Sequence, residues 1–242
     1  MSERRSNISL SEAAEIGFSL APFAAVSALK YSRKYRDTLR ISSKERKRYY
    51  SKSARQAACY AGFSQKLSLK QAAGAGKAAF LTCAYDVATD WGKPPGVTGA
   101  FIQILDAVAS PHLVQMSLKL MERDLRGELE HDGLERGIVA LRFVLEMMGL
   151  EEAYKNKGIN IDKLGMDLQI VDDVLDFEED RISGDTNCLF TPRRDPYLLQ
   201  MTRDLRQESV ASMFPYAGAL KIAINNARDI ASDMLACPVK YF

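Results

Sequence analysis

The acidic segment from Asp167 to Asp185 constrains the fold of this chain more than any other stretch of its sequence. It holds eight carboxylates and a single base, yet six apolar residues are threaded through it between Leu168 and Phe177. A disordered acidic tail would not carry that apolar content. On a helix, Asp172, Asp176 and Asp180 fall at i, i+4 and i+8, so they form one row beside the buried face. The segment is therefore expected to be an amphipathic helix with a line of carboxylates along it.

A row of like charges along one side of a helix is unfavourable unless a cation binds to it. Each i,i+4 pair of equal charges destabilises a helix by a few tenths of a kcal/mol. A folded helix that accepts this cost predicts a bound cation. The chain has only two histidines, and its four cysteines lie far apart, so zinc sites and disulfide frameworks are disfavoured. Carboxylates alone favour a hard cation such as Mg²⁺.

A second acidic pair, Asp86 and Asp90, occurs at i, i+4 near the end of another predicted helix. By itself this spacing is common in helical proteins. Its weight comes from pairing with the richer row around Asp172, because two helices with facing carboxylates could hold several Mg²⁺ ions between them. The pair adjoins an apolar seam formed by Cys83, Val87 and Trp91.

The composition predicts an all-α protein. Among 242 residues there are only 15 Gly and 8 Pro, 47% of residues are hydrophobic, and helix-favouring residues are plentiful. We expect one domain over residues 1–242, built as a bundle of about eight to ten helices. Helices are predicted from near Ser11 through basic segments to Gly62, then over 68–91, 98–129 with an interruption at Ser110-Pro111, 134–148, 162–182, 198–214 and 216–236, with breaks at Gly92–Gly96, Gly149 and Lys157-Gly158.

Positive charge is concentrated in residues 30–55, where eleven Lys or Arg residues stand against two acids, Asp37 and Glu45. A solvated helix face is one interpretation, and an anionic partner is the other. No known nucleic-acid motif accompanies the aromatic residues here, so we expect no nucleic acid. Peripheral membrane contact through this segment stays open, as does a homodimer. No apolar run is long enough to span a bilayer, so we expect a cytoplasmic protein, with membrane association left open.

Residues 169–177, Gln-Ile-Val-Asp-Asp-Val-Leu-Asp-Phe, resemble the second aspartate-rich motif of trans-prenyl diphosphate synthases. The spacing of Asp172, Asp176 and Asp180 is also similar to the metal-binding triad of class I terpene synthases. The continuation through Asn187 is similar to small enzymes of the squalene/phytoene-synthase type. Asp86 and Asp90 resemble the D-x-x-x-D motif of phytoene synthases.

This resemblance implies the isoprenoid-synthase fold, an α-helical bundle around an apolar active-site cavity. It implies that about three Mg²⁺ ions bridge the diphosphate of the substrate to five metal-ligating aspartates, of which Asp86, Asp172 and Asp176 are the central catalytic ones. The full set is Asp86, Asp90, Asp172, Asp176 and Asp180.

The resemblance also implies residues that bind the substrate. Arg126 lies at a spacing from Asp172 similar to that of a diphosphate-sensing arginine, Arg181 follows the acidic row, and Tyr241 belongs to a terminal basic–tyrosine pair. The alternatives are a solvated helix face for Arg126, a favourable charge at a helix C-terminus for Arg181, and a frayed chain end for Tyr241. Four aromatic residues could line the cavity or simply belong to the core: Phe80, Trp91, Phe101 and Phe143.

The expected function is thus that of a Mg²⁺-dependent class I terpene synthase, a carbon–oxygen lyase acting on farnesyl or geranylgeranyl diphosphate. Two alternatives stay open. One is a prenyltransferase that couples two isoprenoid units, as squalene and phytoene synthases do. The other is a non-catalytic helical binding protein whose acidic and basic faces contact partners.

Overall fold

The computed structural model describes residues 20–63, 67–89, 96–126, 134–183 and several positions between 225 and 236. Within these ranges every regular element is a helix and none is a strand, which confirms the all-α prediction. The isoprenoid-synthase fold and its cavity remain predictions. The helices are α2 (Ala21–Tyr35), α3 (Arg46–Ala61), α4 (Leu69–Thr89), α5 (Val97–Val108), α6 (Pro111–Leu125), α7 (Glu135–Met148), α8 (Glu151–Asn156), α9 (Ile161–Leu175) and α10 (Phe177–Ser183).

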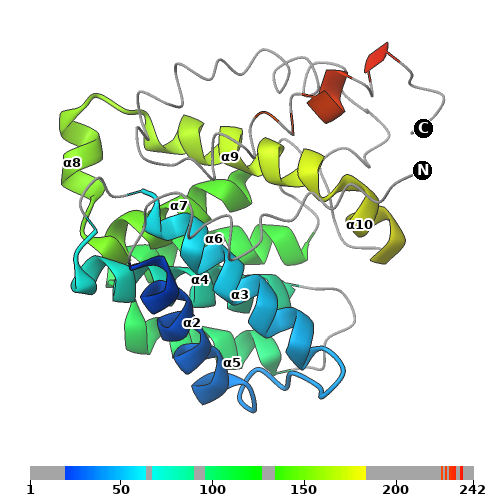
Figure 1. The fold of residues 1–242 in the computed structure, drawn as a ribbon. Helices are drawn as coiled ribbons and strands as arrows, with labels where there is room; N and C mark the ends of the chain where they lie inside the picture. Colours follow the sequence, from blue (N-terminus) through cyan, green and yellow to red (C-terminus); the bar gives the residue numbers. More distant parts are fainter. Residues whose placement is uncertain are drawn as a thin grey trace.

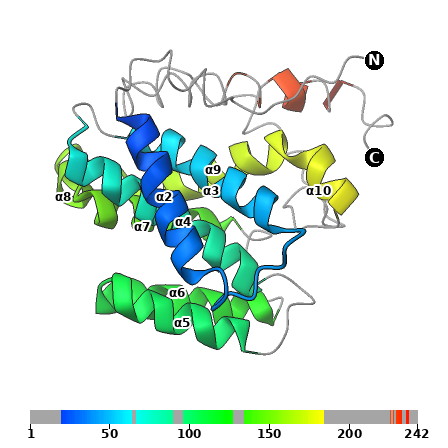
Figure 2. The same cartoon turned by 60° about the horizontal axis from the view of Figure 1, so that its bottom comes forward.

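Helix α4 is the centre of the arrangement. It packs against α2 and α3 on one side and against α7 on another, and α9 in turn packs along α7 (Figure 1). Helices α5 and α6 run side by side beneath this group (Figure 2). Most of α4 is buried because alanine and glycine dominate its sequence, so its neighbours can approach it on several sides. The helix that carries Asp86 is therefore held by the whole bundle.

A pair of glycines brings α7 and α9 into close contact. A methyl group added at Gly137 would collide with the carbonyl oxygen of Gly165, and one added at Gly165 would lie 2.6 Å from the Cα atom of Ile138. Only glycine, which has no Cβ, permits this distance between two helix backbones. The contact fixes α9, which carries Asp172, directly against α7.

Several predicted helix ends are confirmed. Ser68 and Gln71 form a reciprocal capping box at the start of α4, with N···O distances of 3.0 and 3.2 Å. Ser110 caps α6 in front of Pro111, at the predicted interruption. Gly149 ends α7 in the left-handed conformation with φ of 67°. These breaks are local in origin, which is why the sequence pattern predicts them.

The helix predicted over 162–182 is divided in the structure. Helix α9 ends at Leu175, Asp176 leaves the helical conformation, and α10 begins at Phe177. Backbone hydrogen bonds still link Asp176 N to Asp172 O at 2.9 Å and Asp180 N to Asp176 O at 2.8 Å, so the acidic row bends without being interrupted.

Other sequence predictions fall outside the described residues. They include the first helix near Ser11, the break at 92–95, the helix over 198–214 and most of the helix over 216–236. The described positions between 225 and 236 are helical, and Ala227 and Ala231 are buried in the main core cluster. Among the described helices, none has the length and apolar character needed to cross a bilayer.

Candidate functional site

The structure brings the two acidic motifs into one electrostatic environment. Asp86 lies near the end of α4 and Asp172 near the end of α9, and both helices pack on α7. The charge of Asp86 helps to raise the pKa of Asp172, and both carboxylates help to raise the pKa of Lys52. The carboxylates therefore lie around one shared ammonium group, although 86 positions separate them in the sequence.

Lys52, on α3, is the cation that pairs with Asp86. Its Nζ atom lies 3.1 Å from Oδ2 of Asp86, and each of the two side chains is about 40% exposed. The attraction of Asp86 is the main cause that holds the pKa of Lys52 well above its usual value, against the opposing effect of burial. Lys52 therefore stays protonated at neutral pH and partly neutralises the carboxylates. It belongs to the basic 30–55 segment, and nothing in the sequence distinguishes it there from its solvated neighbours.

The surroundings of Asp172 raise the pKa of its carboxyl group. Its side chain is open to solvent, but the surrounding protein still removes enough water that burial raises its pKa to about 8. The negative charge of Asp176 is the next cause, with smaller contributions from Asp173 and Asp86, and Lys52 acts in the opposite direction. The site thus holds more negative charge than its own lysine balances. A divalent cation would relieve this excess and displace the proton.

Neutral groups lie beside the carboxylates. Burial raises the pKa of the Cys59 thiol to about 11 and raises those of Cys83 and Tyr60 as well, so all three stay uncharged at neutral pH. The Cys83 thiol donates to Oε1 of Gln56 at 3.0 Å, which ties α4 to α3. These three groups therefore add no charge of their own. The positive charge of Arg55 acts on both thiols, so Lys52 is not the only base near them.

A buried hydrogen-bond network holds the part of α4 next to Asp86. The Arg136 guanidinium on α7 donates to both oxygens of Asp124 on α6, with Nε at 2.8 Å from Oδ2. The Tyr85 hydroxyl donates to the same Oδ2 atom at 3.2 Å. Since Tyr85 immediately precedes Asp86, this network joins three helices at the position that presents the Asp86 carboxylate.

Replacing Arg136 with Met should destabilise the protein by about 2 kcal/mol, because Asp124 would keep a buried charge without its partner. Arg142→Met is the matched control on the same helix. Its partner Asp162 is 54% exposed, so about 0.5 kcal/mol or less is expected there. Urea unfolding measures both values. Equal effects of the two substitutions would contradict the role assigned to the network.

The remaining predicted charged residues lie in different surroundings. Asp176 lies next to Asp172, and its negative charge acts on that carboxylate. Arg181 pairs with Glu178 on an exposed part of α10, with an N···O distance of 2.9 Å. The Nε atom of Arg126 donates to the Glu122 carbonyl on its own helix at 3.2 Å. Neither of these two contacts involves Asp86 or Asp172, and the diphosphate role of both arginines stays a prediction.

Asp180 follows on α10, half-buried and linked to Asp176 through the backbone. Asp90 and Tyr241 lie outside the described residues. Within the described ranges, His, Cys, Asp and Glu side chains do not form groups of three or more that could hold a metal ion.

Three of the four proposed cavity aromatics, Phe80, Phe101 and Phe143, are fully buried in the core, while Trp91 is not described. Phe80 stacks on Tyr31 and Tyr35 with centroid distances of 5.8 and 5.4 Å, as a core residue does.

Comparisons of the chain with protein-family models, curated proteins and solved structures find no match. The chemistry of Asp86, Asp172 and Lys52 is therefore the basis for assigning a function.

Proposed function

We propose that the chain is a Mg²⁺-dependent class I isoprenoid enzyme that ionises a prenyl diphosphate such as farnesyl or geranylgeranyl diphosphate. A cyclase acting on one substrate is placed slightly ahead of a prenyltransferase that couples two. Ordinary chain elongation is disfavoured, because the first acidic motif, Asp86 to Asp90, is not a full D-D-x-x-D. The observation that carries the proposal is the shared electrostatic environment of Asp86 and Asp172 around Lys52. The resemblance of residues 169–177 to an aspartate-rich prenyl-synthase motif adds to it.

The donor set fits Mg²⁺. This ion keeps several waters and takes one or two protein carboxylates, with substrate phosphate oxygens completing its shell. Asp86 on one side and Asp172 with Asp176 on the other would hold such ions, so a preformed group of three protein ligands is not required. Bound Mg²⁺ supplies Lewis-acid stabilisation of the negative charge that develops on the departing diphosphate.

In this proposal Lys52 has two partners. Without metal it neutralises Asp86 across 3.1 Å. If Asp86 bound a metal ion, the ammonium group of Lys52 would be available to donate a hydrogen bond to a diphosphate oxygen. That hydrogen bond would strengthen as negative charge develops on the leaving group. The Tyr85–Asp124–Arg136 network keeps the end of α4 fixed during this exchange.

Lys52→Met should lower kcat/KM for the prenyl diphosphate by about 100-fold, with part of the loss in KM, because a charged donor to the diphosphate is removed. Lys47→Met is the matched control on the same helix. Lys47 is exposed, so this substitution should leave kcat/KM unchanged. Steady-state kinetics measure both variants. An unchanged kcat/KM in Lys52→Met would rule out contact with the diphosphate.

The pKa of Asp172 predicts how stability depends on pH. Its pKa of about 8 in the folded protein exceeds the ordinary aspartate pKa of 3.8 expected in the unfolded chain, so the folded state binds more protons between these two pH values. The metal-free protein should therefore lose stability as pH rises from about 4 to 8, by on the order of 1 kcal/mol because the carboxylate is open to solvent. Mg²⁺ should bind more tightly over the same rise, since it displaces that proton.

Thermal unfolding at several pH values checks this expectation. Asp172→Asn should flatten the profile of the metal-free protein and remove the stabilisation by Mg²⁺. A variant that keeps the slope of the unmodified protein would show that another group is responsible.

The proposed activity is tested by incubating the purified protein with geranyl, farnesyl, geranylgeranyl and geranylfarnesyl diphosphate, with and without Mg²⁺. Release of inorganic diphosphate only with Mg²⁺ is expected. Gas chromatography of the extracts then separates cyclisation of one substrate from coupling of two. Absence of release with every chain length would overturn both enzymatic assignments.

A further inference from the structure

Helix α2 has two sharply different faces. Ala21, Ala24, Ala25, Ala28 and Ser32 form its buried face, which lies against α3 and α4. The opposite side is exposed, and at 100° per residue five of its positions fall on one side of the helix along about three turns. We call this set of positions the outer stripe of α2, formed by Phe23, Val26, Lys30, Arg33 and Lys34.

The outer stripe begins with apolar side chains and continues with basic ones. Phe23 is 43% exposed and Val26 is 62% exposed. The other exposed large apolar residues in the described part of the chain, Leu69, Leu125 and Ile182, lie on three different helices. Only on α2, among the described helices, do two such residues share one exposed line. Burial would be favourable for both side chains, and the bundle does not bury them.

The positive charge continues from α2 into the adjoining segment. Lys44 is exposed in the turn before α3 and Lys47 is exposed in the first turn of that helix, which packs against α2 (Figures 1 and 2). The two acids of this region have local partners: Asp37 pairs with Arg36 at 3.1 Å, and Glu45 accepts from the Ser42 amide at 2.9 Å. The segment that follows the basic end of the stripe therefore keeps a net positive charge.

We propose that the outer stripe of α2 docks on an anionic lipid membrane. Phe23 and Val26 enter the headgroup region, and the basic side chains contact lipid phosphates, as expected for an interfacial helix with an apolar and a cationic part. Nucleic acid would match the positive charge but would give Phe23 and Val26 no apolar surroundings. The charged area of an acidic protein surface would likewise give Phe23 and Val26 no apolar surroundings.

This docking is independent of the proposed reaction, since it uses none of the residues around Asp86 and Asp172. The two are still compatible, because Lys52 follows Lys47 by little more than one turn of α3. A membrane-dissolved apolar substrate would then reach the protein on the side where α3 begins.

The test is co-sedimentation of the full chain with vesicles of phosphatidylcholine alone and of phosphatidylcholine mixed with phosphatidylglycerol. Binding is expected only to the mixed vesicles, and it should weaken with added salt. Reversing two charges in Lys30→Glu/Arg33→Glu should weaken binding by about ten-fold or more. Phe23→Ala/Val26→Ala should weaken it by a similar factor without changing the charge.

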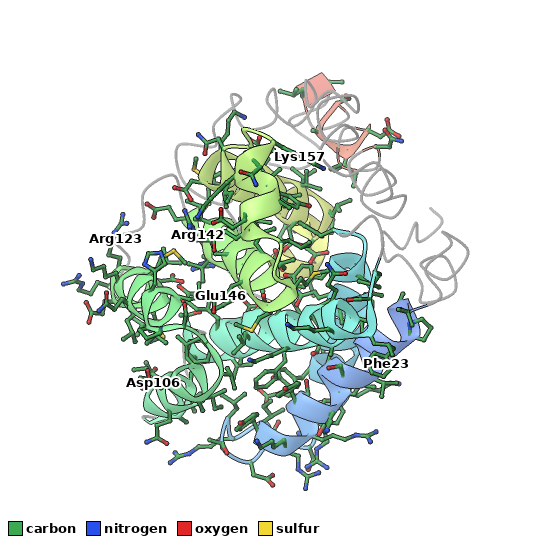
Figure 3. The ribbon with its side chains drawn as sticks, turned by 90° about the vertical axis from the view of Figure 1, so that its left-hand side faces the viewer. Phe23, Asp106, Arg123, Arg142, Glu146 and Lys157 are labelled. Atoms are coloured by element: carbon green, nitrogen blue, oxygen red, sulfur yellow. The ribbon has the colours of Figure 1, made fainter. Side chains whose placement is uncertain are left out.

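Matched controls make the same changes elsewhere. Lys119→Glu/Lys157→Glu reverses two exposed charges away from the stripe, and Figure 3 shows Lys157 well separated from Phe23. Leu69→Ala removes an exposed apolar side chain from another helix. Both controls should bind as the unmodified protein does. Equal binding by all variants, or salt-sensitive binding to generic DNA without binding to vesicles, would overturn the proposal.

Discussion

Asp172→Asn is expected to lower Mg²⁺-dependent diphosphate release by about 1000-fold while leaving the protein folded. The amide cannot supply the negative charge that the proposed metal ions require, and it is a much weaker ligand for Mg²⁺. It also removes a carboxylate that Asp176, Asp173 and Asp86 repel. The variant should therefore be somewhat more stable than the unmodified protein at pH 8 without metal, which separates loss of function from loss of fold.

The matched control is Asp106→Asn. Asp106 is an exposed carboxylate on α5, and Figure 3 shows it on a different helix from those of the candidate site. The substitution makes the same chemical change. The rate of diphosphate release should stay within two-fold of the unmodified value, which corresponds to about 0.4 kcal/mol in activation free energy. A rate loss in Asp106→Asn equal to that in Asp172→Asn would mean that the effect reflects total charge and not the site.

Gly165→Ala is expected to destabilise the protein by about 3 kcal/mol. The new methyl group would lie 2.6 Å from Ile138 Cα and 2.8 Å from the Gly137 carbonyl oxygen, so α7 and α9 must separate. Backbone atoms of a packed helix cannot rotate away as a side chain can, which makes this collision costly. Because α9 carries Asp172, the displacement should also reduce diphosphate release in the molecules that remain folded.

Gly99→Ala provides the opposite case. Gly99 lies within α5, and a methyl group there would meet no atom within 4 Å. Alanine favours a helix more than glycine does, so the free energy of unfolding of this variant should rise by about 0.5 to 1 kcal/mol. Urea unfolding of the two variants compares them directly. A loss of less than 1 kcal/mol in Gly165→Ala would contradict the close packing of the two helices.

The elements of the fold that the sequence predicts are those with local causes. Ser68 with Gln71, Ser110 before Pro111, and Gly149 each end or begin a helix through contacts within a few residues. The break at Asp176 was not predicted, because the acidic run keeps helical spacing on both sides of it. The packing of the helices could not be predicted from the hydrophobic spacing either. The contact between Gly137 and Gly165 is seen only when α7 and α9 are placed side by side.

The same division applies to the candidate site. Asp172 was proposed as a site residue because its acidic row is threaded with apolar residues. Asp86, whose spacing alone is common, was proposed because it could pair with that row. Lys52 could not be predicted, because it resembles every other base in its segment until α3 lies against α4. The bond between Arg136 and Asp124 was missed for the same reason, as it joins two different helices.

Thermal unfolding with Mg²⁺, with pyrophosphate, and with both together tests most directly whether Asp86 and Asp172 jointly hold metal and diphosphate. The account predicts that the pair of ligands raises the melting temperature by more than the sum of their separate effects. It also predicts that Asp86→Asn and Asp172→Asn each abolish this synergy, while Asp106→Asn preserves it. Additive shifts in the unmodified protein, or synergy that survives in either site variant, would contradict the account and favour a non-catalytic binding protein.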